Sequence, residues 1–377
     1  MKLMKIALFT GNYHHIRDGV SITLNRWVKY ATHHGSEVKI FAPTIENPPM
    51  THEGHFIPVP SIAAPGRPEY RMSLFLPSRE REQLESFQPD LVHIATPDLL
   101  GLAALRWAKH HQKKIAATFH TNFASYLKYY GFTAAERAGW SYLIWFYNQC
   151  DHVYVPTTTM LEELVERGVK VPMSIWARGV DMDQFTPERR SSAWREQVGI
   201  SKKDTIISFV SRLVWEKNIR LYATTVNRLM QRYPDVKAFI AGDGPAREEL
   251  QAMIPRGVFT GFIQGEELAD AYANSDIFLF PSDTETFGNV TLEAMSSGVP
   301  CIVADAPGSG SLVEDGENGY VISLGDEDAF FSRAEWLHQN KSLRLEMGKA
   351  SRMRAGNFRR DKIQKGFLDS LHRLTDS

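Results

Sequence analysis

The sequence predicts an α/β protein of two domains, each a doubly wound, Rossmann-like parallel sheet with helices on both faces. Three observations lead to this fold class. The chain has 377 residues, enough for about two domains that each bury a core. Short apolar runs alternate with helix-length amphipathic stretches. A polar stretch with Pro and Gly, residues 177–190, separates two such series, so we place the domain boundary near residue 185.

In the first half, near-continuous runs of Ile, Val, Leu, Phe and Ala are typical of strands covered on both faces. The expected strands are Lys5–Thr10, Glu37–Pro43, Leu91–Ala95, Lys114–His120 and His152–Pro156. Helical patterns lie between them, and the first ends at Gly35, which suits the left-handed position after a helix. The expected helices are Ser21–His33, Asp98–His110 and Ala134–Gln149.

The second half repeats the pattern. Its expected strands are Thr205–Ser211, Val236–Gly242, Val258–Gly261, Ile277–Pro281 and Cys301–Ala304, and its expected helices are Asn218–Arg232, Glu266–Asn274 and Thr291–Ser297. Ligands of open α/β sheets bind beyond the carboxyl ends of the strands. We therefore expect the two domains to face one another across a ligand-binding cleft.

Composition excludes several classes of protein. Lys and Arg total 43 against 44 Asp and Glu, a net charge of −1, so nucleic acid is not an expected partner. No apolar run approaches the ~18 residues of a membrane span, and the N-terminal residues do not resemble a signal peptide. Cys150 and Cys301 are the two cysteines, too few for a disulfide framework or a structural zinc site. We expect a cytoplasmic protein without metal or cofactor.

Several motifs of known chemistry are absent from the sequence. There is neither a G-x-x-x-x-G-K-[ST] phosphate loop nor a G-x-S-x-G elbow. Gly242-Asp-Gly244 and Gly308-Ser-Gly310 lack the third glycine of a dinucleotide-binding fingerprint. His52 and His55 have an i,i+3 spacing in a Pro-rich segment, which favours a loop over a metal site. The pair His14-His15 is expected in an exposed loop.

The most informative stretch is residues 280–300. A buried strand is expected to stop at Pro281, a polar turn carries Glu285, and a helix begins near Asn289 with Glu293 about one turn inside it. Backbone N–H groups at such a helix start suit anionic oxygens, and a carboxylate at Glu293 suits the hydroxyls of a ribose. The structural alternative is that Glu293 only opposes the helix dipole, worth ~0.3–1 kcal/mol, and that Glu285 is a solvated acid.

A second cluster follows the first strand of the second domain. Arg212 and Lys217, five residues apart in a strand-to-helix turn, can converge on one dianion. The alternative is a surface ion pair with Glu216, worth at most ~1 kcal/mol. In the first domain, Gly19 precedes a helix and His120 ends a strand, and a structural role for His120 is the alternative.

These motifs, in this order and spacing, resemble the retaining nucleotide-sugar glycosyltransferases of family 4 (group 1), whose fold is GT-B. The motifs that carry the resemblance are Glu285 and Glu293 in an E-x7-E element, residues 211–218, residues 242–245 and the strand end at His120-Thr121. The resemblance covers essentially the whole chain. It implies an N-terminal acceptor-side domain of residues 1–185, a C-terminal nucleotide-sugar domain of residues 186–355, and a terminal helix, 356–377, that packs back on the first.

The resemblance also implies roles for individual residues. Catalytic roles fall to His120, Glu285, Arg212 and Lys217. Donor binding is implied for Gly19, Arg212, Lys217, Asp243, Phe262, Ile263, Glu285, Phe287, Gly288, Asn289, Val290 and Glu293. The two cations would neutralise the leaving diphosphate, and Glu293 would hold the ribose. One departure is Asp18-Gly19, where the family often has paired glycines.

The expected donor is a nucleotide-diphosphate sugar, GDP-mannose or a UDP-sugar, and the expected acceptor is a membrane lipid such as diacylglycerol or a glycolipid. The resemblance is to lipid-directed mannosyl-, glucosyl- and sulfoquinovosyl-transferases. Aromatic residues over 126–132 and 140–147 suit either an apolar acceptor groove or helix packing. The basic run Arg344–Lys365 is expected as a solvated helix face rather than a membrane contact. Alternatives are a soluble or polysaccharide acceptor, or a sugar phosphorylase or epimerase.

Overall fold

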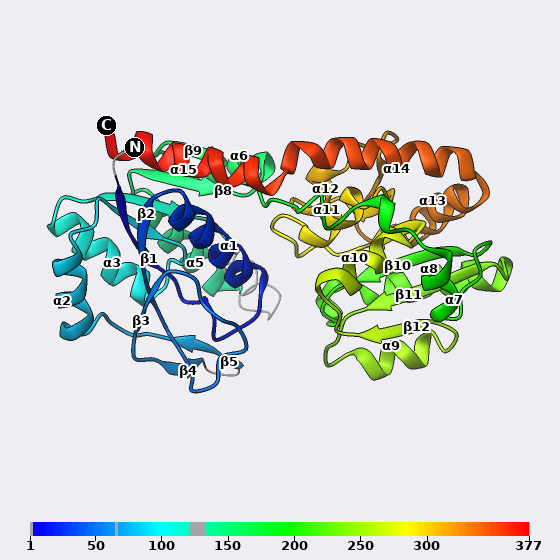
Figure 1. Cartoon of the computed structure of the whole chain (residues 1–377), viewed down its shortest axis with the longest axis horizontal. Coiled ribbons are helices and arrows are strands. Elements are labelled where there is room, and N and C mark those ends of the chain that lie inside the picture. The colour runs from blue at the N-terminus through cyan, green and yellow to red at the C-terminus, as the bar shows by residue number, and fades with distance from the viewer. Residues whose placement is uncertain (1–2, 65–66, 121–132, 377) are drawn as a thin grey trace. The chain divides into compact units, whose positions relative to one another are not determined.

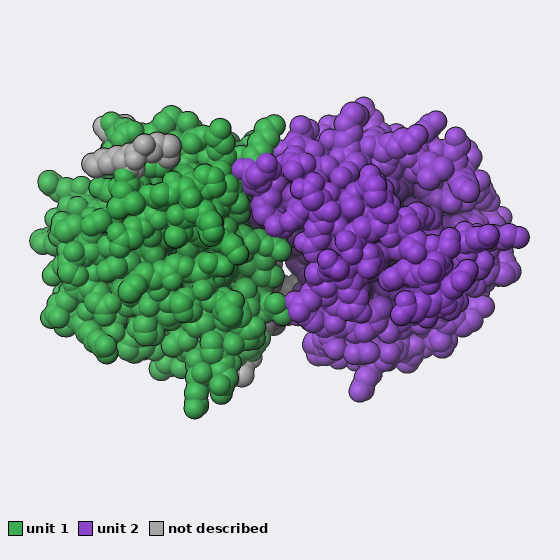
Figure 2. Space-filling model, viewed as in Figure 1, with its two compact units in different colours: residues 1–177, 362–377 green, residues 178–361 purple. Residues whose placement is uncertain are grey.

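The computed structural model describes residues 3–64, 67–120 and 133–376. The chain forms two compact units, and Figure 2 colours them separately: residues 1–177 with 362–377 make unit 1, and residues 178–361 make unit 2. Each unit is an open parallel sheet with helices on both faces (Figure 1). The assignment of an acceptor domain to residues 1–185 and a donor domain to residues 186–355 stays a prediction.

The sheet of unit 1 has seven parallel strands in the order β3-β2-β1-β6-β7-β8-β9. The strands are β1 Met4–Phe9, β2 Ser36–Ala42, β3 His55–Pro58, β6 Leu91–Ile94, β7 Lys114–Thr118, β8 His152–Val155 and β9 Met173–Ile175. The helices are α1 Gly19–His33, α2 Ser78–Phe87, α3 Leu99–His110, α5 Thr133–Tyr147 and α6 Thr158–Glu166. A two-stranded antiparallel hairpin, β4 Ile62–Ala64 and β5 Arg67–Met72, follows β3.

The core of unit 1 lies on both faces of this sheet, because successive side chains of a strand point to opposite sides. On β1, Ala7 and Phe9 pack into one buried cluster and Ile6 and Leu8 into the other. The second cluster also takes in the C-terminal helix α15, Arg360–Asp376. Its Phe367 ring stacks on Trp176 with centroids 3.7 Å apart. The last helix of the chain therefore completes the core that the first strand begins (Figure 1).

Unit 2 has six parallel strands in the order β12-β11-β10-β13-β14-β15. The strands are β10 Thr205–Val210, β11 Val236–Ala241, β12 Val258–Gly261, β13 Ile277–Phe280, β14 Cys301–Ala304 and β15 Gly319–Ile322. The helices are α7 Ser192–Gln197, α8 Ile219–Arg232, α9 Arg247–Met253, α10 Gly265–Ala273, α11 Asn289–Ser296, α12 Ser309–Leu312, α13 Glu327–Gln339 and α14 Lys341–Ala355, with 3₁₀ turns at Pro187–Arg189, Trp215–Lys217 and Gly356–Phe358. The strand order reverses between β10 and β13, the point at which open α/β sheets bind their ligands.

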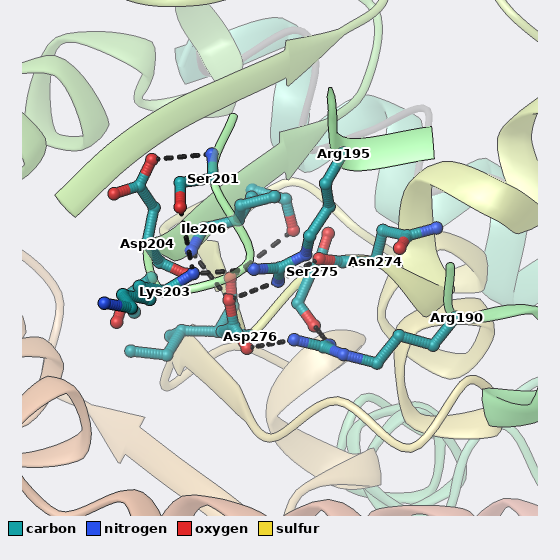
Figure 3. A network of polar contacts seen from close by, with 12 residues as sticks. Arg190, Arg195, Ser201, Lys203, Asp204, Ile206, Asn274, Ser275 and Asp276 are labelled. Carbon is teal, nitrogen blue, oxygen red and sulfur yellow. Dashed lines mark hydrogen bonds and ion pairs between the residues drawn. The ribbon is translucent and has the colours of Figure 1, made fainter. Parts of the chain in front are cut away.

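A buried ion-pair network ties the N-terminal part of unit 2, around Arg190 and Arg195, to the sheet of that unit (Figure 3). Arg195 donates to Asp276 at 2.6 Å and to the carbonyl oxygen of Asn274 at 2.6 Å, and its side chain is only 3% exposed. Arg190 donates to the other carboxylate oxygen of Asp276 at 2.6 Å. Burial by itself raises the pKa of Asp276, but the two guanidinium groups and the amide of Ile206 outweigh it and hold that pKa below its ordinary value.

Two expectations about charged segments are wrong. His14 and His15 are buried, not exposed, because the loop after β1 folds under residues 43–56: His14 contacts Thr44 and the Phe56 ring, and His15 contacts the Pro43 carbonyl. The basic run Arg344–Lys365 is not a solvated face throughout. Arg352 donates to the carbonyl oxygens of Met182, Phe185 and Ser296, and Arg344 is buried against those of Leu337 and His338.

Candidate active site

The strongest cluster of predicted site residues lies in unit 2, at the reversal between β10 and β13. Lys217 stands in the turn after β10, and Glu285 in the turn after β13. The Lys217 Nζ lies 2.6 Å from Glu285 Oε1 and 2.9 Å from Thr284 Oγ1. Both side chains of the ion pair are mostly buried, at 16% and 21% exposed. The structure thus brings together two of the residues predicted to be catalytic.

The turn that carries Lys217 is fastened to the end of β13. Asn218 adopts the left-handed conformation at φ 52°, and its Nδ2 donates to the carbonyl oxygen of Pro281 at 2.9 Å. Asparagine tolerates this conformation better than most residues with a side chain. The bend redirects the chain from the 3₁₀ turn into α8, which leaves Lys217 next to Thr284 and Glu285.

A second turn, residues 308–309, supports Glu285 from the side of β14. Gly288 has φ +94°, and a side chain there would meet Ser309 Oγ at 2.6 Å. A Cβ on Gly308 would lie 2.3 Å from the carbonyl oxygen of Glu285. Thr291 donates to Ser309 Oγ at 2.8 Å. Sequence reasoning treated Gly308-Ser-Gly310 as a failed dinucleotide fingerprint and missed this role; two glycines just beyond a strand end were the available signal.

Helix α11 begins at Asn289, and its N-cap residue is Gly288, which has no side chain to cap the first turn. The neighbouring Phe287 is buried and packs edge-on against Phe358, while Val290 is partly buried. A helix start of this kind carries a partial positive charge that favours an anion. The predicted phosphate-binding amides belong to residues 287–289, which follow Glu285 of the Lys217–Glu285 pair by two to four residues.

Glu293 lies on the second turn of α11 and is partly buried. Burial, together with the charge of the Glu293 carboxylate beside it, raises the pKa of Tyr272 on α10 well above its ordinary value. The Tyr272 ring is fully buried between Phe185 and Phe278. The carboxylate of Glu293 thus stands at the edge of the core, next to a phenol that sequence reasoning did not single out.

Arg212 differs from Lys217 in its surroundings. Its side chain is 51% exposed and lies 3.5 Å from Glu216 Oε1, the surface pair that the sequence offered as the alternative. The backbone around it is fixed by two glycines. A Cβ on Gly242 or Gly244 would meet the carbonyl oxygen of Ser211 or Leu213, at 1.8 and 2.3 Å. These two glycines therefore allow the segment around Arg212 to pack closely against residues 242–244. Close approach of the same backbone to a ligand would be a separate role.

The remaining donor-binding predictions in unit 2 lie around β11 and β12. Asp243 pairs with Arg247 at 3.0 Å and accepts, through its carbonyl oxygen, the amide of Leu213 at 2.9 Å. After β12, Phe262 is 60% exposed whereas Ile263 is buried. An exposed aromatic ring beside a strand end can stack on a base.

The two predicted site residues of unit 1 follow its own strands. Gly19 is exposed at the first position of α1, and Asp18 before it caps the helix by accepting the amide of Ser21 at 2.8 Å. His120 follows β7, is buried, and meets the Trp176 ring edge-on at 5.5 Å. The expected acceptor residues 126–132 lie outside the described residues. Of the second aromatic segment, Phe146 and Tyr147 belong to the core, which is the packing alternative.

The part of the chain that the structure describes holds neither a metal-ligand cluster nor a membrane-spanning helix. Within residues 3–64, 67–120 and 133–376, no three His, Cys, Asp or Glu side chains come together as metal ligands. In the same ranges, no helix combines the length and the apolar character needed to cross a bilayer.

Comparison with known protein families shows the family to which the chain belongs. The family model described as glycosyl transferases group 1 matches residues 191–354, and the one described as glycosyltransferase family 4 matches residues 17–184. A GDP-mannose-dependent alpha-mannosyltransferase of Corynebacterium glutamicum is 31% identical over 341 residues, 89% of this chain and 80% of that one. The chain belongs to the group 1, family 4 glycosyltransferases. This glycosyltransferase is therefore an enzyme that transfers a hexosyl group from a nucleotide-activated sugar.

Two further comparisons bear on this glycosyltransferase. The alpha-monoglucosyldiacylglycerol synthase of Streptococcus pneumoniae is 26% identical, over 86% of this chain and 76% of that one. The solved sucrose-phosphate synthase of Thermosynechococcus elongatus is 19% identical, with a TM-score of 0.78 over 98% of this chain and 99% of that one. The likeness to that structure confirms the predicted GT-B fold of two Rossmann-like domains.

Proposed function

We propose that this glycosyltransferase moves a hexosyl group, with retention of configuration, from GDP-mannose or a UDP-sugar to a membrane lipid such as diacylglycerol or a glycolipid. One similar protein is named for GDP-mannose and another for a glucosylated diacylglycerol, which supports this donor and acceptor class. The observation that carries the proposal is the Lys217–Glu285 pair at the strand reversal of unit 2. The pair brings a cation and a carboxylate together. A sugar diphosphate has a matching partner for each, because it carries both an anionic diphosphate and hydroxyl groups.

In the proposed reaction, cleavage of the glycosyl–phosphate bond develops positive charge on the anomeric carbon and negative charge on the diphosphate. Lys217 and Arg212 bind the diphosphate, and the start of α11 adds its backbone N–H groups. Groups fixed in place before the reaction stabilise this charge separation more than they stabilise the bound substrate, and so they lower the barrier. Lys217 is already fixed by Thr284 and Glu285.

The two carboxylates of the site bind the hydroxyl groups of the transferred sugar and of the ribose. Glu285 accepts hydrogen bonds from hydroxyls of the transferred sugar, and Glu293 accepts them from the ribose. Phe262 and Ile263 contact the base. From unit 1, Gly19 lets its loop approach the diphosphate and His120 contacts the sugar near its anomeric carbon. Attack on the face from which the diphosphate departs accounts for retention without an enzymic nucleophile.

The acceptor side is assigned to unit 1, and the enzyme is proposed to work as a peripheral protein on the cytoplasmic face of a membrane. The test is a donor panel of GDP-mannose, UDP-glucose and UDP-galactose given to the purified full chain, with and without vesicles that contain diacylglycerol. Nucleotide release that depends on the vesicles, with labelled sugar in the lipid extract, is expected. Release that needs only a soluble glycan, or sugar phosphate formed from inorganic phosphate, would replace the proposal with its alternatives.

A further inference from the structure

The hydroxyl of Thr284 joins the turn after β13 to the turn after β10. Its Oγ1 accepts a hydrogen bond from Lys217 Nζ at 2.9 Å and donates one to the carbonyl oxygen of Glu216 at 3.3 Å. A third contact, of 3.4 Å, joins it to Ser282 Oγ. Thr284 is partly buried and Ser282 is fully buried. One side chain therefore holds two consecutive residues of a turn that lies 67 residues away in the sequence.

The partners of this hydroxyl fix the direction of each hydrogen bond. A lysine ammonium group can only donate and a backbone carbonyl can only accept, so the single proton of the Thr284 hydroxyl points at Glu216. The two lone pairs remain, one for Lys217 and one for the hydroxyl of Ser282, which must donate here. With one donor and two acceptor positions in use, Thr284 presents a lone pair, not a proton, to the ammonium group.

Glu216 extends this arrangement to the second predicted cation. Its carbonyl oxygen accepts from Thr284, while its carboxylate lies 3.5 Å from Arg212 Nη2. The Glu216 side chain is 24% exposed and that of Arg212 is 51% exposed, so the more buried carboxylate restrains the more exposed guanidinium group. Thr284 thus contacts Lys217 directly and fixes the residue that pairs with Arg212.

We propose that Thr284 is a positioning residue of the transfer reaction, whose hydroxyl holds the Lys217 ammonium group in place for the diphosphate of the donor. Glu285 attracts the same ammonium group at 2.6 Å and is also proposed to bind sugar hydroxyls. A neutral hydroxyl restrains the ammonium group without a second negative charge, which would repel the diphosphate. The inference rests on the proposed function, because it requires Lys217 to bind the diphosphate.

The experiment is a double-mutant cycle on the full chain, with nucleotide release measured for the donor and acceptor that the panel selects. Valine has nearly the shape of threonine but no hydroxyl. Thr284→Val should lower kcat/KM about tenfold or more, the usual worth of a hydrogen bond to a charged group. In a Lys217→Ala background the same substitution should change kcat/KM by no more than about twofold, because its effect passes through the ammonium group. Thr284→Ser keeps the hydroxyl and should restore most of the rate.

Thr225→Val is the matched control. Thr225 is buried on α8 of the same unit, and its hydroxyl has no hydrogen-bond partner among the residues that the structure describes. This variant should keep the kcat/KM and the melting temperature of the wild type. Because threonine gives way to valine at a buried place in both variants, the control separates loss of a hydroxyl as such from loss of the contact with Lys217.

The possible results separate the inference from the proposed function. Equal losses from Thr284→Val with and without Lys217 would overturn the inference, because the hydroxyl would then serve the fold alone. Full activity in Thr284→Val, or a Thr284→Ser variant as slow as Thr284→Val, would overturn it as well. If Lys217→Ala is slow in the same assays, only the inference fails. Full activity in Lys217→Ala would remove the proposed role of Lys217 and the inference together.

Discussion

Lys217 and Glu285 stand 68 residues apart in the sequence, yet their Nζ and Oε1 atoms lie 2.6 Å apart, at the ends of two neighbouring parallel strands. The pair is mostly shielded from solvent, so its attraction is weakly screened, although the cost of desolvating both charges offsets much of that gain in stability. Each partner fixes the other, and both are therefore in position before a substrate arrives. This preorganisation is what a charge-separating reaction uses.

Lys217→Ala should lower turnover about a hundredfold, the usual loss when one preorganised donor to a developing anion is removed. The melting temperature should fall by no more than a few degrees, because the Glu285 side chain is 21% exposed and water can solvate its carboxylate once the lysine is gone. Nucleotide release and thermal unfolding measure the two effects. Lys202→Ala, an exposed residue of the same unit, should change neither. Normal turnover in Lys217→Ala would leave the pair with a structural role alone.

Glu293→Gln should raise the KM for the nucleotide sugar about tenfold or more, because a hydrogen bond to a charged group contributes about 1.5–3 kcal/mol. A donor with 2′-deoxyribose provides the matched test. The wild type should lose rate with that donor, and the variant should lose little further. Equal losses in both enzymes would place the ribose elsewhere. Glu248→Gln, on the exposed side of α9, serves as the control variant.

Gly308→Ala should lower turnover at least tenfold although residue 308 is no donor ligand in the proposal. Its methyl group would lie 2.3 Å from the carbonyl oxygen of Glu285 and would displace that turn from Lys217. Overpacking of this kind costs about 1–3 kcal/mol of stability. Gly366→Ala, where nothing lies within 4 Å of the added atom, should leave activity and melting temperature unchanged. Steady-state kinetics of both variants decide the point.

Arg195→Ala should destabilise unit 2 by about 3–5 kcal/mol, because it removes one of the two arginines that pair with the buried Asp276 carboxylate. Denaturant unfolding measures the loss, and Arg228→Ala, which breaks the exposed pair with Asp328, should cost little. The lowered pKa of Asp276 adds a pH dependence. Its contribution is present above the ordinary carboxyl pKa and is lost as the pH falls below it. A small, pH-independent loss in Arg195→Ala would contradict this account.

Unit 1 should lose stability as the pH falls from about 6.5 toward 4. Burial, helped by the neighbouring His52 and His15, lowers the pKa of His14 to about 4. Between these two pH values the His14 imidazole binds a proton in the unfolded chain but not in the folded chain, so acid favours unfolding. His14→Gln should flatten the dependence of the melting temperature on pH, whereas His33→Gln, at an exposed position, should not. An unchanged slope in His14→Gln would assign the effect to other groups.

The sequence predicted most of the fold because buried parallel strands have a simple pattern. β1, β7, β10 and β11 are mostly apolar, each with one or two polar residues, and were found within about two residues of their true ends. β4 and β5 were missed, since a hairpin containing Pro, Arg and Glu resembles a loop in sequence. The burial of His14 and Arg344 was also missed. Both are held by carbonyl or hydroxyl partners that come from other segments, which a local pattern does not reveal.

The candidate site was predictable in part for a related reason. Lys217 and Glu285 each follow a strand end, and parallel strands bring such ends to one edge of a sheet. The support from Gly308 and the phenol beside Glu293 were not predictable, because they depend on how turns pack against each other. Whether the predicted residues perform the roles given to them is decided by the variants above.

Helix α15 carries Phe367, Leu368 and Leu371 into the core that β1 begins, so unit 1 is built from two stretches of the chain that unit 2 separates. A fragment that stops at residue 177 would expose the Trp27 and Trp176 rings on which Phe367 rests. Chimeras that exchange the first halves of two such enzymes must therefore carry the matching tail with them. During synthesis on the ribosome, residues 1–177 cannot complete this core until residues 362–376 have emerged.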